Sequence, residues 1–179
     1  PGRRRAVFLP LDRAGEVAGV AVELDARGFY ARLAAVFGTL NLEGAAVTPR
    51  GLCVLNRGRP RHGDNACAWL DLDRVLGDAG ALGGPPARVR RVTLGRTGGI
   101  PLCFTDAAAL PDGSIVFTAV AEDAANAYDD GPCRGAAIGV LRPDGALARL
   151  APVAPVLKLE GIAVAPGSLI ELSAWVRSE

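Results

Sequence analysis

Apolar residues recur along this chain in short runs separated by turn residues, a pattern that predicts β-strands rather than long helices. The runs include 52–55, 66–72 and 115–117. One stretch differs, because Phe29, Leu33 and Phe37 follow one another at helical spacing within 26–37. The sequence therefore predicts an all-β fold with one short helical segment at 26–37.

One strand–turn–strand pattern occurs three times along the chain. Each copy has an acidic residue, two small or apolar residues, an alanine, a branched apolar residue, a Pro/Gly turn and a second apolar stretch. We align the copies on Glu43, Asp106 and Glu160. Proline fixes φ and glycine supplies a positive φ, so each turn marks a hairpin. A second hairpin follows each of the first two copies, so a complete unit has about four strands.

Four-stranded antiparallel units that repeat every 50 to 60 residues or so are typical of β-propeller blades. A β-sandwich with accidental similarity between hairpins is the alternative, and the recurring register favours the propeller. We therefore expect a single β-propeller domain over 1–179, with approximate blades at 1–40 (partial), 41–100, 101–156 and 157–179 (partial). The chain has room for about three blades and part of another, whereas a closed propeller has at least four blades. We therefore expect an N-terminally truncated piece of a five- or six-bladed propeller.

Composition narrows the classes of partner. Twenty basic residues balance 19 acidic ones, which gives a net charge of +1 and no electrostatic reason to expect nucleic acid or an anionic membrane. No apolar run is long enough to span a membrane. Arginine supplies all the basic residues except Lys158, which we interpret as coding bias of a GC-rich genome. The chain begins at Pro1 rather than at Met, so a preceding segment with a secretion signal is conceivable. We favour a cytoplasmic location and keep secretion as the alternative.

Cysteine and histidine usage argues against a structural zinc site. The chain has four cysteines and one histidine, and no two cysteines have the C-x-x-C spacing. We expect at least two of the cysteines to be buried thiols that pack as small hydrophobic side chains. The cysteines are Cys53, Cys67, Cys103 and Cys133.

The repeated acids are the first candidate site. Innermost propeller strands line a central channel, so Glu43, Asp106 and Glu160 are expected at one depth near the axis. Clustered carboxylates repel one another unless a cation, an arginine or protonation neutralises them. Ca²⁺ accepts such oxygen ligands. We weigh a Ca²⁺ site at these acids against purely structural acids that cap strands, and Arg57 could neutralise one acid without metal.

Two polar loops supply further candidates. The stretch 122–130 contains Glu122, Asp123 and Tyr128, and it follows an inner hairpin on the face where propellers usually bind ligands. The stretch 59–65 contains His62 and Asn65. His62 is the only histidine and hence the obvious acid/base group at neutral pH. In each case a solvated polar loop is the alternative. We predict ligand contacts from Arg57, Asn65, Asp123 and Tyr128 and proton transfer from Glu122 or His62.

The segments 41–46, 101–110 and 158–163 resemble signature segments of an uncharacterised bacterial β-propeller family. That family is similar in style to esterase-like phytase propellers and, more distantly, to the gluconolactonase/paraoxonase group. The resemblance covers about residues 3–165. Gluconolactonase-like propellers hold Ca²⁺ on the axis with Glu, Asn and Asp, so the resemblance implies Glu43, Asp106 and Glu160 as ligands here. The Asn ligand has no counterpart in this chain.

Two function classes follow from these residues. The first is a binding module that takes a small-molecule or protein ligand at the channel mouth. The alternative is a Ca²⁺-dependent hydrolase of lactonase, esterase or phosphoesterase type, in which the metal polarises the substrate oxygen. The sequence contains no G-x-S-x-G elbow, P-loop or Rossmann glycine fingerprint. Since no nucleophile–base pair is evident either, the sequence favours the binding module.

Overall fold

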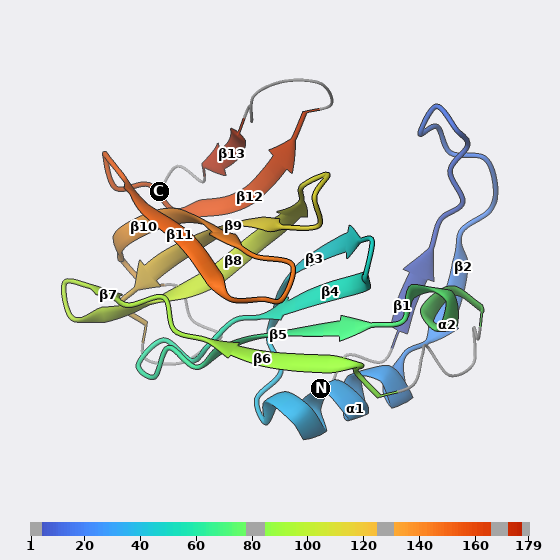
Figure 1. Ribbon diagram of the computed structural model, residues 1–179, viewed down its shortest axis with the longest axis horizontal. Helices are drawn as coiled ribbons and strands as arrows, with labels where there is room; N and C mark the ends of the chain where they lie inside the picture. The colour runs from blue at the N-terminus through green and yellow to red at the C-terminus, as the bar shows by residue number, and fades with distance from the viewer. Residues whose placement is uncertain (1–4, 78–84, 125–130, 166–171, 177–179) are drawn as a thin grey trace.

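The computed structural model describes residues 5–77, 85–124, 131–165 and 172–176 (Figure 1). The two helices are α1 (Arg27–Phe37) and α2 (Leu72–Gly77). The strands are β1 (Arg5–Phe8), β2 (Val22–Asp25), β3 (Leu42–Thr48), β4 (Gly51–Asn56), β5 (Asn65–Leu70), β6 (Arg88–Val92), β7 (Arg96–Thr97), β8 (Ile100–Ala109), β9 (Ile115–Glu122), β10 (Cys133–Leu141), β11 (Leu147–Val153), β12 (Leu159–Val164) and β13 (Leu172–Val176).

The strands form four antiparallel sheets. In the first large sheet the order is β3-β4-β5-β6, and in the second it is β11-β10-β9-β8-β7. Within each, four successive strands pair with their neighbours along the chain, and the two-residue β7 extends the second sheet beside β8. The pairs β1-β2 and β12-β13 form two-stranded sheets. The predicted all-β class is confirmed, and so is the helical segment, which is α1.

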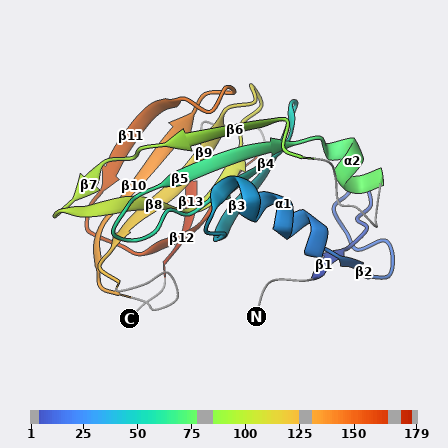
Figure 2. The ribbon, with the colours of Figure 1, turned by 90° about the horizontal axis from the view of Figure 1, so that it is seen from below.

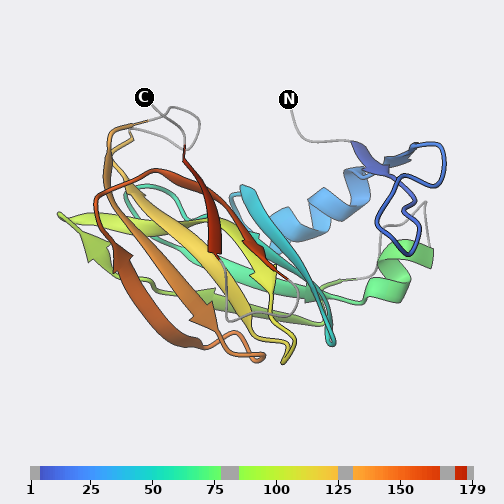
Figure 3. The ribbon, with the colours of Figure 1, turned by 90° about the horizontal axis from the view of Figure 1, so that it is seen from above.

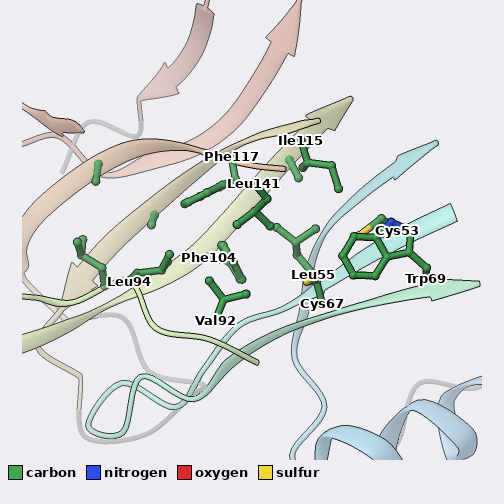
Figure 4. Close-up of a cluster of buried hydrophobic side chains, with 14 of the residues drawn as sticks. Cys53, Leu55, Cys67, Trp69, Val92, Leu94, Phe104, Ile115, Phe117 and Leu141 are labelled. Atoms are coloured by element: carbon green, nitrogen blue, oxygen red, sulfur yellow. The ribbon is translucent and has the colours of Figure 1, made fainter. Parts of the chain in front are cut away.

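The main core lies between the two large sheets. Cys53, Leu55 and Trp69 from the first sheet pack in one buried cluster with Phe104 and Phe117 from the second (Figure 4). The two phenylalanine rings meet edge to face with their centroids 4.9 Å apart, a favourable aromatic geometry. Aliphatic side chains, alanines and cysteines fill most of the rest of this interface.

The outer faces of the two sheets are covered by different elements. Leu33 and Phe37 of α1 pack on Val54 of the first sheet, so the helix lies along that face (Figure 2). On the other side, Val120 of the second sheet packs with Leu159 of β12. The layers therefore run from α1 through the two sheets to β12 (Figure 1). Figure 3 looks along this stack from the side of β12. Neither described helix has the length and apolar character that a membrane crossing requires.

The strands β3, β8 and β12 are neighbours, and each carries an irregularity in its pairing with the next strand. The residue skipped by the register is Glu43 in β3, Thr105 in β8 and Glu160 in β12. Asp106 follows the skipped residue, at the position where the other two strands have glycine. The sequence alignment of the three acids is therefore off by one residue in the middle copy.

The glycine after the irregularity in β3 has a packing reason. A Cβ on Gly44 would lie 2.9 Å from the backbone nitrogen of Ala107 in β8, closer than Cβ atoms approach backbone in real structures. Only glycine therefore lets β3 come this close to β8. The close approach brings the ends of the neighbouring sheets together, and with them the charged side chains described next.

Candidate functional site

A buried carboxylate, Glu122, lies between two cations from different parts of the fold. Glu122 ends β9, Arg57 follows β4, and Lys158 immediately precedes β12. Arg57 Nη2 lies 2.5 Å from Glu122 Oε2, and Lys158 Nζ lies 3.0 Å from Glu122 Oε1. The exposed fractions of these side chains are 4% for Glu122, 15% for Arg57 and 9% for Lys158. The three groups thus form an ion-pair cluster that is largely removed from water.

Two further acids extend the cluster toward solvent. Arg57 Nη1 lies 3.9 Å from Glu43 Oε1, and Lys158 Nζ lies 3.3 Å from Glu160 Oε1. Glu43 is 31% exposed and Glu160 is 41% exposed. We call this set of five residues, Glu43–Arg57–Glu122–Lys158–Glu160, the charged chain. Acids and cations alternate along it, and it crosses from the first large sheet through the second to β12.

The cations keep Glu122 ionised although it is buried. Burial alone would raise the pKa of this carboxyl, since a low dielectric disfavours its charged form. Hydrogen bonds from Lys158 and Arg57, together with one from the backbone N–H of Gly131 at 3.1 Å, outweigh burial and hold the pKa of Glu122 below its ordinary value. Glu122 is therefore ionised at neutral pH although it is buried.

This lowered pKa predicts a loss of stability in acid. Because the pKa of Glu122 is lower in the folded than in the unfolded chain, its ionisation stabilises the fold above the unfolded pKa. The contribution disappears as pH falls through the folded pKa. We expect the unfolding free energies of wild type and Glu122→Gln, measured by urea titration, to differ most at neutral pH and to converge in acid. A difference that stays constant from pH 7 to pH 3 would contradict this assignment.

Asp106 lies beside the charged chain and makes a backbone contact. Its Oδ2 accepts a hydrogen bond of 2.8 Å from the backbone N–H of Ile162, which ties β8 to β12. At the preceding, skipped position, the Thr105 hydroxyl is bonded to that of Thr118 at 2.9 Å. The middle copy thus has a neutral group where the other two have glutamates.

The geometry gives the predicted Ca²⁺ site no support. Among the described residues, no three His, Cys, Asp or Glu side chains are grouped so that they could hold a metal ion. Glu43 and Glu160 each lie beside a cationic side chain, and Asp106 accepts a backbone hydrogen bond. These contacts are those of the alternative in which the acids are structural and Arg57 neutralises one of them.

Asn65 holds two sheets together rather than facing a channel. The residue is fully buried at the start of β5. Its Oδ1 accepts hydrogen bonds from the backbone N–H groups of Gly58 and Phe104, at 3.0 and 3.1 Å. Its Nδ2 donates to the carbonyl of Leu102 at 2.8 Å. Three polar atoms of the backbone, two of them in β8, therefore depend on this one side chain.

Asp123 and His62 do not join the charged chain. Asp123 is exposed and lies 3.5 Å from Arg134. His62 is exposed in the loop between β4 and β5, where its backbone N–H donates to the carbonyl of Arg59. Tyr128 lies outside the described residues. Of the two proton-transfer candidates, only Glu122 lies within the charged chain.

The cysteines are free thiols, and Cys53, Cys67 and Cys103 are buried, as the sequence predicted. Burial raises the pKa of Cys103 to about 11, although the positive charge of Arg57 acts in the opposite direction. A thiol with this pKa is protonated at neutral pH and is a poor nucleophile. Its burial and raised pKa therefore argue against Cys103 as a nucleophile.

Sequence reasoning missed Lys158 as a site residue. The signal was present, because Lys158 is the only lysine in a chain that otherwise uses arginine. Lysine carries a compact point charge, whereas arginine presents a planar fork of donors. In the structure this compact ammonium group lies between the carboxylates of Glu122 on β9 and Glu160 on β12.

Comparison with known proteins places the chain in a family. A family of unknown function, DUF6910, matches residues 1–176. The chain belongs to DUF6910. No curated protein sequence and no solved structure gives a significant match. For this member of DUF6910, function therefore has to be argued from the geometry of the charged chain.

Proposed function

We propose that the chain is a binding module built from β-propeller blades, which holds a positively charged ligand at the end of the inner strands. In this proposal the two large sheets are successive blades and β12-β13 begins the next, within a five- or six-bladed propeller. Support comes from the order of strands in the two sheets, their face-to-face core, and the contact of β3 and β12 with β8.

The observation that carries the functional proposal is the charged chain itself. Ion pairs removed from water are a poor source of stability, because desolvation of the charges offsets most of their attraction. Apolar side chains would join the three sheets at lower cost. A row of five charged groups at this junction is therefore better explained by recognition of a ligand, and groups with perturbed pKa values gather at functional sites.

The exposed ends of the charged chain determine the sign of the ligand. Glu43 and Glu160 keep part of their surface in water, whereas Arg57 and Lys158 are mostly covered. Solvent therefore meets carboxylate oxygens, and Asp106 adds a further negative charge nearby. An amine or guanidinium group, on a small molecule or on a protein side chain, is complementary to this surface.

The hydrolase alternative has less support from the same contacts. A catalytic acid or base must gain or lose its proton during the reaction. Glu122 is bonded to two cations and one backbone N–H, all of which favour its ionised form.

Thermal unfolding of the full chain tests the proposal. Arginine, agmatine, spermidine and CaCl₂ are each titrated, with glutamate and citrate as anionic controls. A ligand that binds only the folded state at 100 times its Kd adds about 2.7 kcal/mol of stability, a rise of several degrees in Tm. We expect this rise from at least one of the organic cations and none from the anions.

Variants locate the effect within the fold. Glu43→Gln and Glu160→Gln should each reduce the ligand-induced rise in Tm, whereas the exposed Glu16→Gln should leave it unchanged. Stabilisation by anions, or by no organic cation, would overturn the proposal. Stabilisation by CaCl₂ alone that depends on Glu43 and Glu160 would replace it with the metal-dependent alternative.

A further inference from the structure

Strand β6 is an exposed edge with an unusual number of charges. It is the last strand of the first large sheet among the described residues (Figure 1). Four of its five residues are exposed, and three of these are arginines. The three are Arg88, Arg90 and Arg91. An edge strand offers unpaired backbone N–H and C=O groups to any other extended chain, so this edge combines hydrogen-bonding capacity with positive charge.

The turn between β10 and β11 lies beside this edge and carries one arginine and one aspartate. Arg90 Nη1 lies 3.6 Å from Asp144 Oδ2 in that turn. The pKa of Asp144 is held below its ordinary value first by a hydrogen bond from the backbone N–H of Ala146, and then by the charges of Arg90, Arg142 and Arg88. The charges of three exposed arginines therefore act on a single carboxylate, and the surface keeps an excess of positive charge.

A protective role alone does not account for this excess. Charged side chains on edge strands discourage self-association, and one charge or a proline is a common device. The outermost strand of the second sheet, β11, has one arginine and Pro152. The otherwise similar β6 has three arginines with no proline, and its partly exposed Val89 leaves room for an apolar contact.

We propose that the edge of β6 binds an acidic peptide segment in extended form, which adds a strand to the first sheet. Carboxylates of the segment would pair with Arg88, Arg90 and Arg91, and its backbone would pair with that of β6. Pairing of an added strand gives affinity through main-chain hydrogen bonds and specificity through alternate side chains. This surface is separate from the charged chain, so the inference does not depend on the function proposed above.

The experiment measures binding of fluorescent peptides to the full chain by anisotropy. The probe peptide contains Glu-Glu-Val-Glu, which in antiparallel pairing places a carboxylate opposite each arginine and a valine opposite Val89. Three control peptides have Gln for Glu, Lys for Glu, or a central Pro that blocks strand pairing. We expect the acidic peptide to bind at least about tenfold more tightly than each control, a difference of about 1.4 kcal/mol or more.

Charge reversal on the protein gives the matched comparison. Arg88→Glu/Arg91→Glu should lose the acidic peptide and gain the lysine peptide, whereas Arg13→Glu/Arg149→Glu, with the same change in net charge, should do neither. Equal binding of the proline peptide would overturn strand addition. Tighter binding of a single-stranded oligonucleotide, or equal binding of the Gln peptide, would overturn the choice of an acidic peptide. The measurements with the proline peptide, the Gln peptide and the oligonucleotide use the unmodified protein, so they do not depend on whether a variant folds.

Discussion

Replacement of Glu122 by glutamine is expected to destabilise the fold by about 3 to 5 kcal/mol, the usual cost of removing one partner from a buried ion pair. The substitution keeps the shape of the side chain but leaves Arg57 and Lys158 positively charged, close together and mostly covered. Urea unfolding at pH 7, followed by circular dichroism, measures the loss.

An exposed ion pair supplies the control. Arg5 and Glu23 lie 3.2 Å apart on the β1-β2 hairpin, and both side chains are more than half exposed. Such pairs contribute about 0 to 1 kcal/mol, so Glu23→Gln should change stability little. Equal effects of the two substitutions would mean that Glu122 is not the centre of a buried cluster.

A concerted apolar replacement separates stability from function. Arg57→Met/Glu122→Leu/Lys158→Met removes both signs of charge together, and such exchanges are often neutral or stabilising. Because Glu43 and Glu160 keep their carboxylates, we expect a folded protein that still responds to organic cations, and we expect Glu43→Gln/Glu160→Gln in this background to abolish the response. A response that survives removal of all five charges would show that the charged chain is not the ligand site.

Asn65→Ala is expected to cost about 3 kcal/mol or more, because it leaves three buried backbone groups without partners at about 1 to 3 kcal/mol each. The affected groups belong to Gly58, Leu102 and Phe104. Since two of them are in β8, the loss also loosens the contact between the large sheets. Urea unfolding measures the free energy, and hydrogen exchange of the Phe104 amide should accelerate.

Asn41→Ala is the matched control for Asn65. The backbone of Asn41 takes part in hydrogen bonds, its N–H with Asn56 Oδ1 and its carbonyl with the N–H of Arg57. Removal of its side chain leaves these bonds in place. If Asn41→Ala and Asn65→Ala proved equally destabilising, the assignment of Asn65 as a link between sheets would be wrong.

Local pattern was enough to predict the main strands and the helix α1, but not α2 or the two-residue β7. The Pro-x-Gly turn before Ser114 and the spacing of Phe29, Leu33 and Phe37 report local geometry, which needs no knowledge of distant contacts. The register of the middle copy was missed because the three copies were aligned on their acidic residues, which matched Asp106 rather than Thr105 with Glu43. Counting back from the turn proline would have matched Thr105 with Glu43, since the irregularity lies at a fixed distance from the turn.

The members of the site were easier to predict than their partners. Glu43, Arg57, Glu122 and Glu160 are all visible as charged residues at strand ends, yet nothing local says that Glu122 contacts Arg57 across two sheets. Asn65 shows the reverse problem, because its loop looks polar and solvated while the side chain is fully buried. Both outcomes depend on how the sheets pack, a long-range property that a single sequence does not specify.

The most direct test asks whether Lys158 is buried against Glu122 in the charged chain. Because Lys158 is the only lysine, amine acetylation followed by peptide mass spectrometry reports on a single side chain once the N-terminal amine is counted separately. Arg13→Lys adds an exposed reference in the same protein. We predict that Lys158 reacts at least about tenfold more slowly than Lys introduced at position 13, and that Glu122→Gln removes much of this protection. Equal rates at the two positions in the otherwise unchanged protein would contradict the account.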